Sequence, residues 1–204
     1  AFNVSYNTAL LALSVASLST ANSISIFNNG LTSVDLSGLT AVTDYFSISN
    51  NATLSTLAVA SLSTAGSVEI SYNGLTSLDL SGLTALTGNG LPGNSAFNVS
   101  YNTALLALSV ASLTSANSVN IENNGLTSLD FSGLTTVTGS FTIQNNASLT
   151  TLTAASLTTA YSVGINNNGL TSVDLSGLTN LTGSFSISGN AALTTLAVTS
   201  LSTA

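Results

Sequence analysis

The feature that most constrains this chain is an internal repeat of 22 residues. Short Φ-x-Φ segments, where Φ is a large apolar residue, begin at nine regularly spaced positions: Phe2, Ile24, Phe46, Val68, Phe97, Val119, Phe141, Val163 and Phe185. Every step is 22 residues except that from Val68 to Phe97, which is 29. A repeat this short cannot bury its apolar face alone, so the pattern predicts stacked coils around one continuous core.

Each repeat carries two segments in which apolar residues alternate with polar ones. After the initial Φ-x-Φ comes a Leu-x-x-Leu-x-Val segment, as in Leu54-Ser-Thr-Leu57-Ala-Val59. A period of two predicts strands with one buried face. Odd and even repeats differ in detail and alternate along the chain. We therefore predict an all-β, parallel β-solenoid of nine coils, arranged as two-coil repeats of 44 residues, with residues 1–204 forming a single domain.

An asparagine occupies the fifth position after the start of every repeat: Asn7, Asn29, Asn51, Asn73, Asn102, Asn124, Asn146, Asn168 and Asn190. Turns inside a solenoid bury backbone N–H and C=O groups that need partners, and an amide side chain offers both donors and an acceptor. We expect these residues to form one buried structural ladder. In even repeats a glycine follows the asparagine, and we expect it to adopt a positive φ.

The spacing of these residues resembles a known family. Even repeats such as Val119-x-Ile121-x-x-Asn124-x-Leu126 resemble the leucine-rich repeat core, Leu-x-Leu-x-x-Asn-x-Leu. Odd repeats resemble the looser variant of receptor L-domains and related fungal cell-wall glycoproteins. The resemblance covers the whole chain and implies a right-handed coil in a secreted, extracellular or cell-surface protein. It implies no particular function, because such repeats serve adhesion, ligand binding, ice binding and scaffolding.

Composition excludes several classes of function. The chain has seven acidic residues and no Lys, Arg, His or Cys, for a net charge of −7. Nothing can neutralise nucleic-acid phosphates or anionic lipid head groups, and no apolar run approaches the roughly 18 residues of a membrane span. Without His, Cys or Lys, and without a close pair of acids, the usual bases and nucleophiles are missing. We expect a non-enzymatic protein without a cofactor.

Four aspartates share one outward position of the even repeats: Asp35, Asp79, Asp130 and Asp174. On alternate coils they would lie roughly 9–10 Å apart. One cation cannot bridge that gap, since Ca–O distances are about 2.3–2.6 Å. We expect a solvated row and no metal site.

A Ser or Thr directly follows the last leucine of every coil and forms what we call the closing-leucine row: Ser19, Thr40, Ser63, Thr84, Thr114, Thr135, Thr158, Thr179 and Ser202. Regular rows of Thr resemble the ice-binding surface of solenoid antifreeze proteins. Hydroxyl groups that bond the nearby backbone of a turn explain the same residues. Both interpretations stay open, with ice or glycans as the partners that such a surface suggests.

Three sequons are predicted N-glycosylation sites, at Asn3, Asn98 and Asn180. Two further sequons start at the ladder residues Asn51 and Asn146, which we expect to be buried and unmodified.

The long step in the repeat contains an insertion at residues 89–95, with the only proline of the chain. Residues 96–113 repeat residues 1–18 without a change. The insertion is therefore interpreted as a seam between duplicated blocks, 1–88 and 96–204, although a recognition loop remains an alternative.

Three functions remain. The first is a structural or adhesive segment of an extracellular stalk or filament, because neither end of the repeat array carries a polar or charged cap. We expect further coils, or self-association of the chain in a head-to-tail contact that does not close. The alternatives are an ice-binding protein and a receptor-type recognition module.

Overall fold

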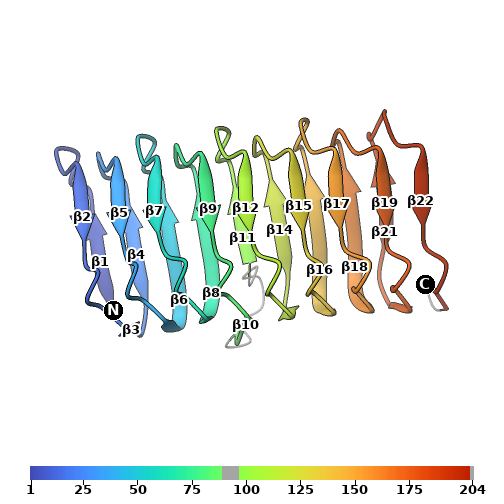
Figure 1. Cartoon of the computed structure of the whole chain (residues 1–204), viewed down its shortest axis with the longest axis horizontal. Helices are drawn as coiled ribbons and strands as arrows, with labels where there is room; N and C mark the ends of the chain where they lie inside the picture. The colour runs from blue at the N-terminus through green and yellow to red at the C-terminus, as the bar shows by residue number, and fades with distance from the viewer. Residues whose placement is uncertain (89–96, 203–204) are drawn as a thin grey trace.

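The computed structural model describes residues 1–88 and 97–202. The chain is an all-β solenoid whose coils stack in a row along the long axis, with the first and last coils at opposite ends (Figure 1). All strand pairs are parallel. No helix occurs in the described ranges, and hence none that could cross a membrane. The predicted fold class is confirmed.

The first wall of the solenoid is a long parallel sheet that takes one strand from each coil. Its register places Phe2 opposite Ile24 and carries on through the chain, so the predicted coil starts are confirmed. Val68 lies opposite Phe97, so the 29-residue step keeps this register. The strands are β1 (Phe2–Ser5), β4 (Ile24–Phe27), β6 (Ala41–Ser49), β8 (Thr64–Ser71), β11 (Phe97–Ser100), β14 (Val119–Glu122), β16 (Thr136–Gln144), β18 (Thr159–Asn166) and β21 (Phe185–Ser188).

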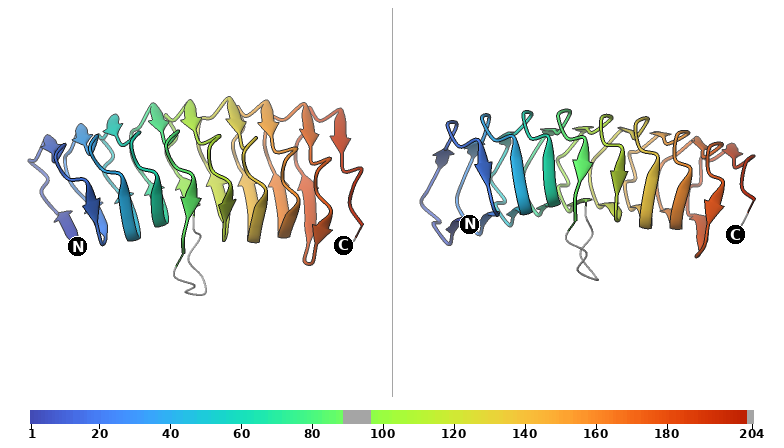
Figure 2. Two further views of the ribbon diagram at one scale, coloured as in Figure 1. Left: turned by 60° about the horizontal axis from the view of Figure 1, so that its bottom comes forward. Right: turned by 90° about the horizontal axis from the view of Figure 1, so that it is seen from below.

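The second wall consists of three-residue strands in three shorter parallel sheets. In each strand the middle residue points inward, as Leu13 does opposite Val34, and its two neighbours point outward. Turned views show these strands side by side in successive coils (Figure 2). The strands are β2 (Ala12–Ser14), β5 (Ser33–Asp35), β7 (Thr56–Ala58), β9 (Ser77–Asp79), β12 (Ala107–Ser109), β15 (Ser128–Asp130), β17 (Thr151–Thr153), β19 (Ser172–Asp174) and β22 (Thr195–Ala197).

A third, narrow wall closes coils one to eight. It contains the two-residue strands β3 (Thr20–Ala21), β10 (Ala85–Leu86), β13 (Ser115–Ala116) and β20 (Asn180–Leu181). It also contains the first residues of β6, β8, β16 and β18, which continue round the corner into the first wall. Register shifts after Val42 and Val137 mark this corner.

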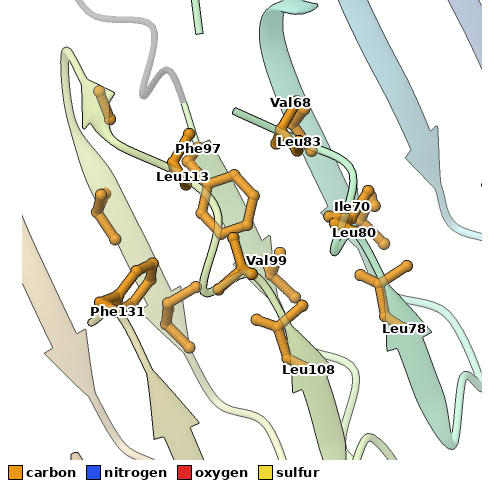
Figure 3. Close-up of a cluster of buried hydrophobic side chains, with 14 of the residues drawn as sticks. Val68, Ile70, Leu78, Leu80, Leu83, Phe97, Val99, Leu108, Leu113 and Phe131 are labelled. Atoms are coloured by element: carbon orange, nitrogen blue, oxygen red, sulfur yellow. The ribbon is translucent and has the colours of Figure 1, made fainter. Parts of the chain in front are cut away.

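The three walls enclose one apolar core. Side chains from both β8 and β11, including Val68 and Phe97, point into the same interior (Figure 3). Phe131 packs edge-on against Phe97 and Phe141, with ring centroids 6.4 and 5.7 Å apart. Burial of the core decreases at the two ends, where the inward residues of the first and last coils are half-buried or exposed.

The glycines that follow ladder asparagines were expected to have positive φ, and this expectation is wrong. Positive φ occurs one residue before the ladder asparagine, at values of 54–60° for Tyr6, Asn28, Asn50, Tyr72, Tyr101, Asn123, Asn145 and Asn167 and at 68° for Gly189. Gly30 and its equivalents are required by space instead. A Cβ on Gly30 would lie 2.1 Å from the carbonyl oxygen of Thr8 in the preceding coil.

Candidate functional site: the ladder and the outer surfaces

The asparagine ladder links each coil to the one before it. The Oδ1 atom of Asn51 accepts a hydrogen bond from the backbone N–H of Asn29 at 3.0 Å. Its Nδ2 group donates to the carbonyls of Ile26, in the preceding coil, and of Ser49, in its own coil, at 3.1 and 2.9 Å. The bonds to the backbone of the preceding coil recur in all eight coils after the first. The ladder therefore has a direction.

Eight ladder residues are buried as predicted, from Asn29 to Asn190, but Asn7 is exposed. The direction of the ladder explains this difference. Each amide is covered by the coil before it, and no coil precedes Asn7 among the described residues. Asn190, at the other end, still packs against coil eight and is only 9% exposed.

The closing-leucine row forms a second ladder, on the outside. Each hydroxyl donates to the backbone carbonyl of the row residue in the preceding coil, as Thr40 does to Ser19 at 3.0 Å and Thr158 to Thr135 at 2.9 Å. The bond recurs from Thr40 to Ser202. All row residues are exposed except Ser63, which is half-buried. The hydroxyl protons are thus committed to the backbone, while the side chains still line the surface.

A parallel row of hydroxyls follows the mid-coil leucine and behaves in the same way. Thr32 donates to the carbonyl of Leu11, and Thr150 to that of Thr127. Leu11 and Leu106 interrupt this row and are 63% and 56% exposed. They are the most exposed large aliphatic side chains in the described residues.

The aspartate row stabilises turns. Asp35 Oδ1 accepts the backbone N–H of Ser37 at 3.0 Å, and Asp79, Asp130 and Asp174 accept the equivalent N–H at 2.8–2.9 Å. Hydrogen bonds from the hydroxyl and the N–H of the serine two residues later lower the pKa of Asp35, Asp79 and Asp174. Across the described ranges, no three acidic side chains gather as a metal site would require.

Exposed tyrosines occupy the positive-φ position, one residue before the ladder asparagine, in three coils. This tyrosine column was not predicted from the sequence. The rings of Tyr72 and Tyr101 stack in parallel, with centroids 4.5 Å apart. The negative charge of Glu122 raises the pKa of Tyr101. Tyr6 packs edge-on against Phe27. The repeated tripeptide Ser-Tyr-Asn at 5–7, 71–73 and 100–102 was the available signal: it places a tyrosine one residue before each of these ladder asparagines.

The predicted N-glycosylation sites have different surroundings. Asn3 in β1 and Asn180 in β20 are exposed. Asn98 in β11 is half-buried, and its Oδ1 accepts a hydrogen bond from the side chain of Asn120 at 3.1 Å. The sequons at Asn51 and Asn146 begin at fully buried ladder residues. The insertion at 89–95 lies outside the described residues.

Comparisons with known proteins returned nothing: no family model, no curated protein and no solved structure matches this chain. The evidence for the β-solenoid architecture is the parallel register of strands between successive coils.

Proposed function

We propose that this chain is a non-enzymatic structural or adhesive segment of an extracellular stalk or filament, whose coils continue end to end. The observation that carries the proposal is the state of the two end faces. Leu196 of coil nine is 44% exposed, whereas its equivalent two coils earlier, Leu152, is 5% exposed. Phe2, Val4 and the other inward residues of coil one are likewise only partly buried. Both faces therefore expose apolar surface that a further coil would cover.

The ladder supports the same proposal. In coil eight, the backbone N–H of Asn168 donates to Asn190 of the next coil at 3.0 Å. No coil lies beyond coil nine among the described residues, so the N–H of Asn190 is placed to donate to the ladder asparagine of a following coil. At the other end, the exposed amide of Asn7 is placed to bond a preceding coil. The two faces thus present complementary halves of one hydrogen-bonding pattern.

The sides of the solenoid favour a scaffold over a catalyst. The carboxylates of the aspartate row accept hydrogen bonds from backbone N–H groups of turns, and the hydroxyls of the closing-leucine row donate to backbone carbonyls. The proposed extracellular location rests on the resemblance of the Asn and Leu spacing to leucine-rich repeats of surface proteins. That finer family relationship is part of the proposal.

Electron microscopy of the protein in its native, unprocessed form tests this function. Nine coils would span on the order of 40 Å. We expect rods clearly longer than this, or filaments whose axial repeat is a whole number of coils. Separate particles no longer than nine coils would contradict the proposal.

Ice binding is the second candidate, favoured by the exposure and strict register of the closing-leucine row. Its test is a thermal-hysteresis measurement with the purified chain. A gap between freezing and melting that disappears on Thr135→Tyr, Thr158→Tyr and Thr179→Tyr would place ice binding first. Thr158→Ser, which keeps the hydroxyl, is the matched control. No gap in the unmodified chain would remove this candidate.

A further inference from the structure

Odd and even coils turn the corner before the closing leucine with different residues but equal length. Even coils have glycine there, at Gly38, Gly82, Gly133 and Gly177, and odd coils have serine, at Ser17, Ser61, Ser112, Ser156 and Ser200. The same backbone hydrogen bond closes both turns, from Leu18 to Val15 in coil one and from Leu39 to Leu36 in coil two, at 2.9 Å each. The chain therefore passes this corner in a comparable way in both kinds of coil.

The glycines of even coils lie against carbonyl groups of the odd coil before them. A Cβ on Gly38 would be 2.0 Å from the carbonyl oxygen of Ala16, and one on Gly133 would be 2.3 Å from that of Ala111. Gly82 and Gly177 show the same approach, at 2.4 and 2.2 Å. Real Cβ atoms essentially never come within 3.0 Å of such an atom. An even coil stacked on an odd coil therefore has no room for a side chain at this position without a shift of the backbone.

The ladder corner imposes the same condition a second time. A glycine follows the ladder asparagine of each even coil. A Cβ added to it would lie 2.1–2.6 Å from a carbonyl oxygen of the preceding odd coil, which is that of Ala147 for Gly169. Two independent corners thus distinguish an even coil from an odd one. All four odd-to-even contacts in the chain obey both conditions.

We propose that the outer face of coil nine is a docking surface for an even-type coil and rejects an odd-type coil. Coil nine is odd, and by position Thr199 and Ala191 supply the two carbonyls that require glycine. The partner is a 22-residue unit with the pattern of coil eight, Val163-x-Ile165-x-x-Asn168-Gly169. The Oδ1 atom of its asparagine would accept a hydrogen bond from the backbone N–H of Asn190. Coil one of a second copy carries Ser17 and Thr8 at these positions, so direct stacking of two copies is disfavoured relative to a continuing even coil.

The test extends the complete chain by one coil. A copy of residues 161–184 is added after Ala204, which supplies the two connecting residues and an even-type coil. We expect the backbone amide of Asn190 to exchange its hydrogen more than about tenfold more slowly than in the unextended chain. The urea midpoint should also rise, because the apolar face of coil nine becomes covered.

Two extended variants serve as controls. In the first, Gly169→Ala and Gly177→Ala are made in the added copy only. In the second, the added coil is odd-type, with residues 161–162 followed by a copy of 141–162. Both should leave Asn190 exchange close to that of the unextended chain. Protection of Asn190 by either control to the same extent as by the even coil overturns the inference, as does its absence with the even coil itself.

The inference rests on the proposed array function, yet the two can fail separately. Equal protection by odd and even coils would remove the distinction between them and leave the array proposal intact. Native particles limited to nine coils would contradict the array, whatever the extended variants show.

Discussion

An odd coil and the even coil after it bury equivalent side chains but differ at their corners. In the second wall, Leu13, Val34 and Leu57 lie in register across three successive coils. The spacing between equivalent positions nevertheless alternates: Thr32 donates to a residue 21 positions earlier, and Ser55 to one 23 positions earlier. In the first wall, paired residues lie 22 positions apart, except for 29 between Val68 and Phe97. The comparison indicates that core residues are interchangeable between coils, whereas the corner glycines belong to even coils alone.

The largest effect is expected where the glycine of an even corner is replaced by a residue with a side chain. Gly133→Ala places a Cβ against the carbonyl of Ala111 and should lower the free energy of unfolding by about 3 kcal/mol. Ser112→Ala, at the same corner of the preceding odd coil, should change it by less than about 0.5 kcal/mol, because Ser112 is exposed. Urea denaturation measures both. Similar values for the two variants would remove the proposed difference between corners.

The ladder should show no such difference. Asn124→Ala, in an even coil, removes the acceptor of the Asn102 N–H and one donor to the carbonyl of Val99. Asn146→Ala does the same in an odd coil. Each should cost about 1–3 kcal/mol, the usual penalty for a buried group that loses its hydrogen bond.

Asn7 provides the matched control for the ladder. It is exposed, and its amide donates only to Ser5 and to Asn29. Asn7→Ala should therefore cost less than about 1 kcal/mol. A cost equal to that of Asn124→Ala would contradict the direction assigned to the ladder.

The smallest expected effect is the loss of stability at acid pH. It involves the aspartate row, which occurs only on even coils. The pKa values of Asp35, Asp79 and Asp174 are lowered in the folded chain from 3.8 by bonds to serine. Their contribution to stability is present above the unfolded pKa and is lost as the pH falls through the lowered folded value.

Urea midpoints measured from neutral pH to about pH 2 test this contribution. They should decline at the acid end, and less steeply in the variant with Asp35→Asn, Asp79→Asn and Asp174→Asn, which keeps the acceptor oxygen. An identical decline in both proteins would assign the acid sensitivity to other groups.

The sequence was sufficient to predict the coil starts and the ladder, because both depend on local spacing. The alternation around Val68 and Val119 has a period that only strands satisfy, and one asparagine recurs per coil. The reason for the glycines could not be predicted in this way. It depends on the close approach of Gly30 to the carbonyl of Thr8. These two residues are 22 positions apart in the chain and come together only when the coils stack.

The exposure of Asn7 and the tyrosine column were missed for related reasons. A repeat pattern gives every coil the same environment, whereas the ladder points in one direction and treats the first coil differently. Positive φ is uncommon for tyrosine, so nothing in the residue type indicated that Tyr72 and Tyr101 would adopt it. Their stacking follows from a spacing between coils that the sequence does not state.

The direction of the asparagine ladder also bears on how the protein is made. Each amide finds its backbone partners in its own coil and in the coil before it, both already synthesised when it leaves the ribosome. A newly emerged coil can therefore complete its side-chain bonds on a finished template. The growing tip then keeps one ladder N–H unbonded until the next asparagine arrives. A chain of this kind is suited to folding during translation, from its first residue toward its last, at the pace at which it is extended.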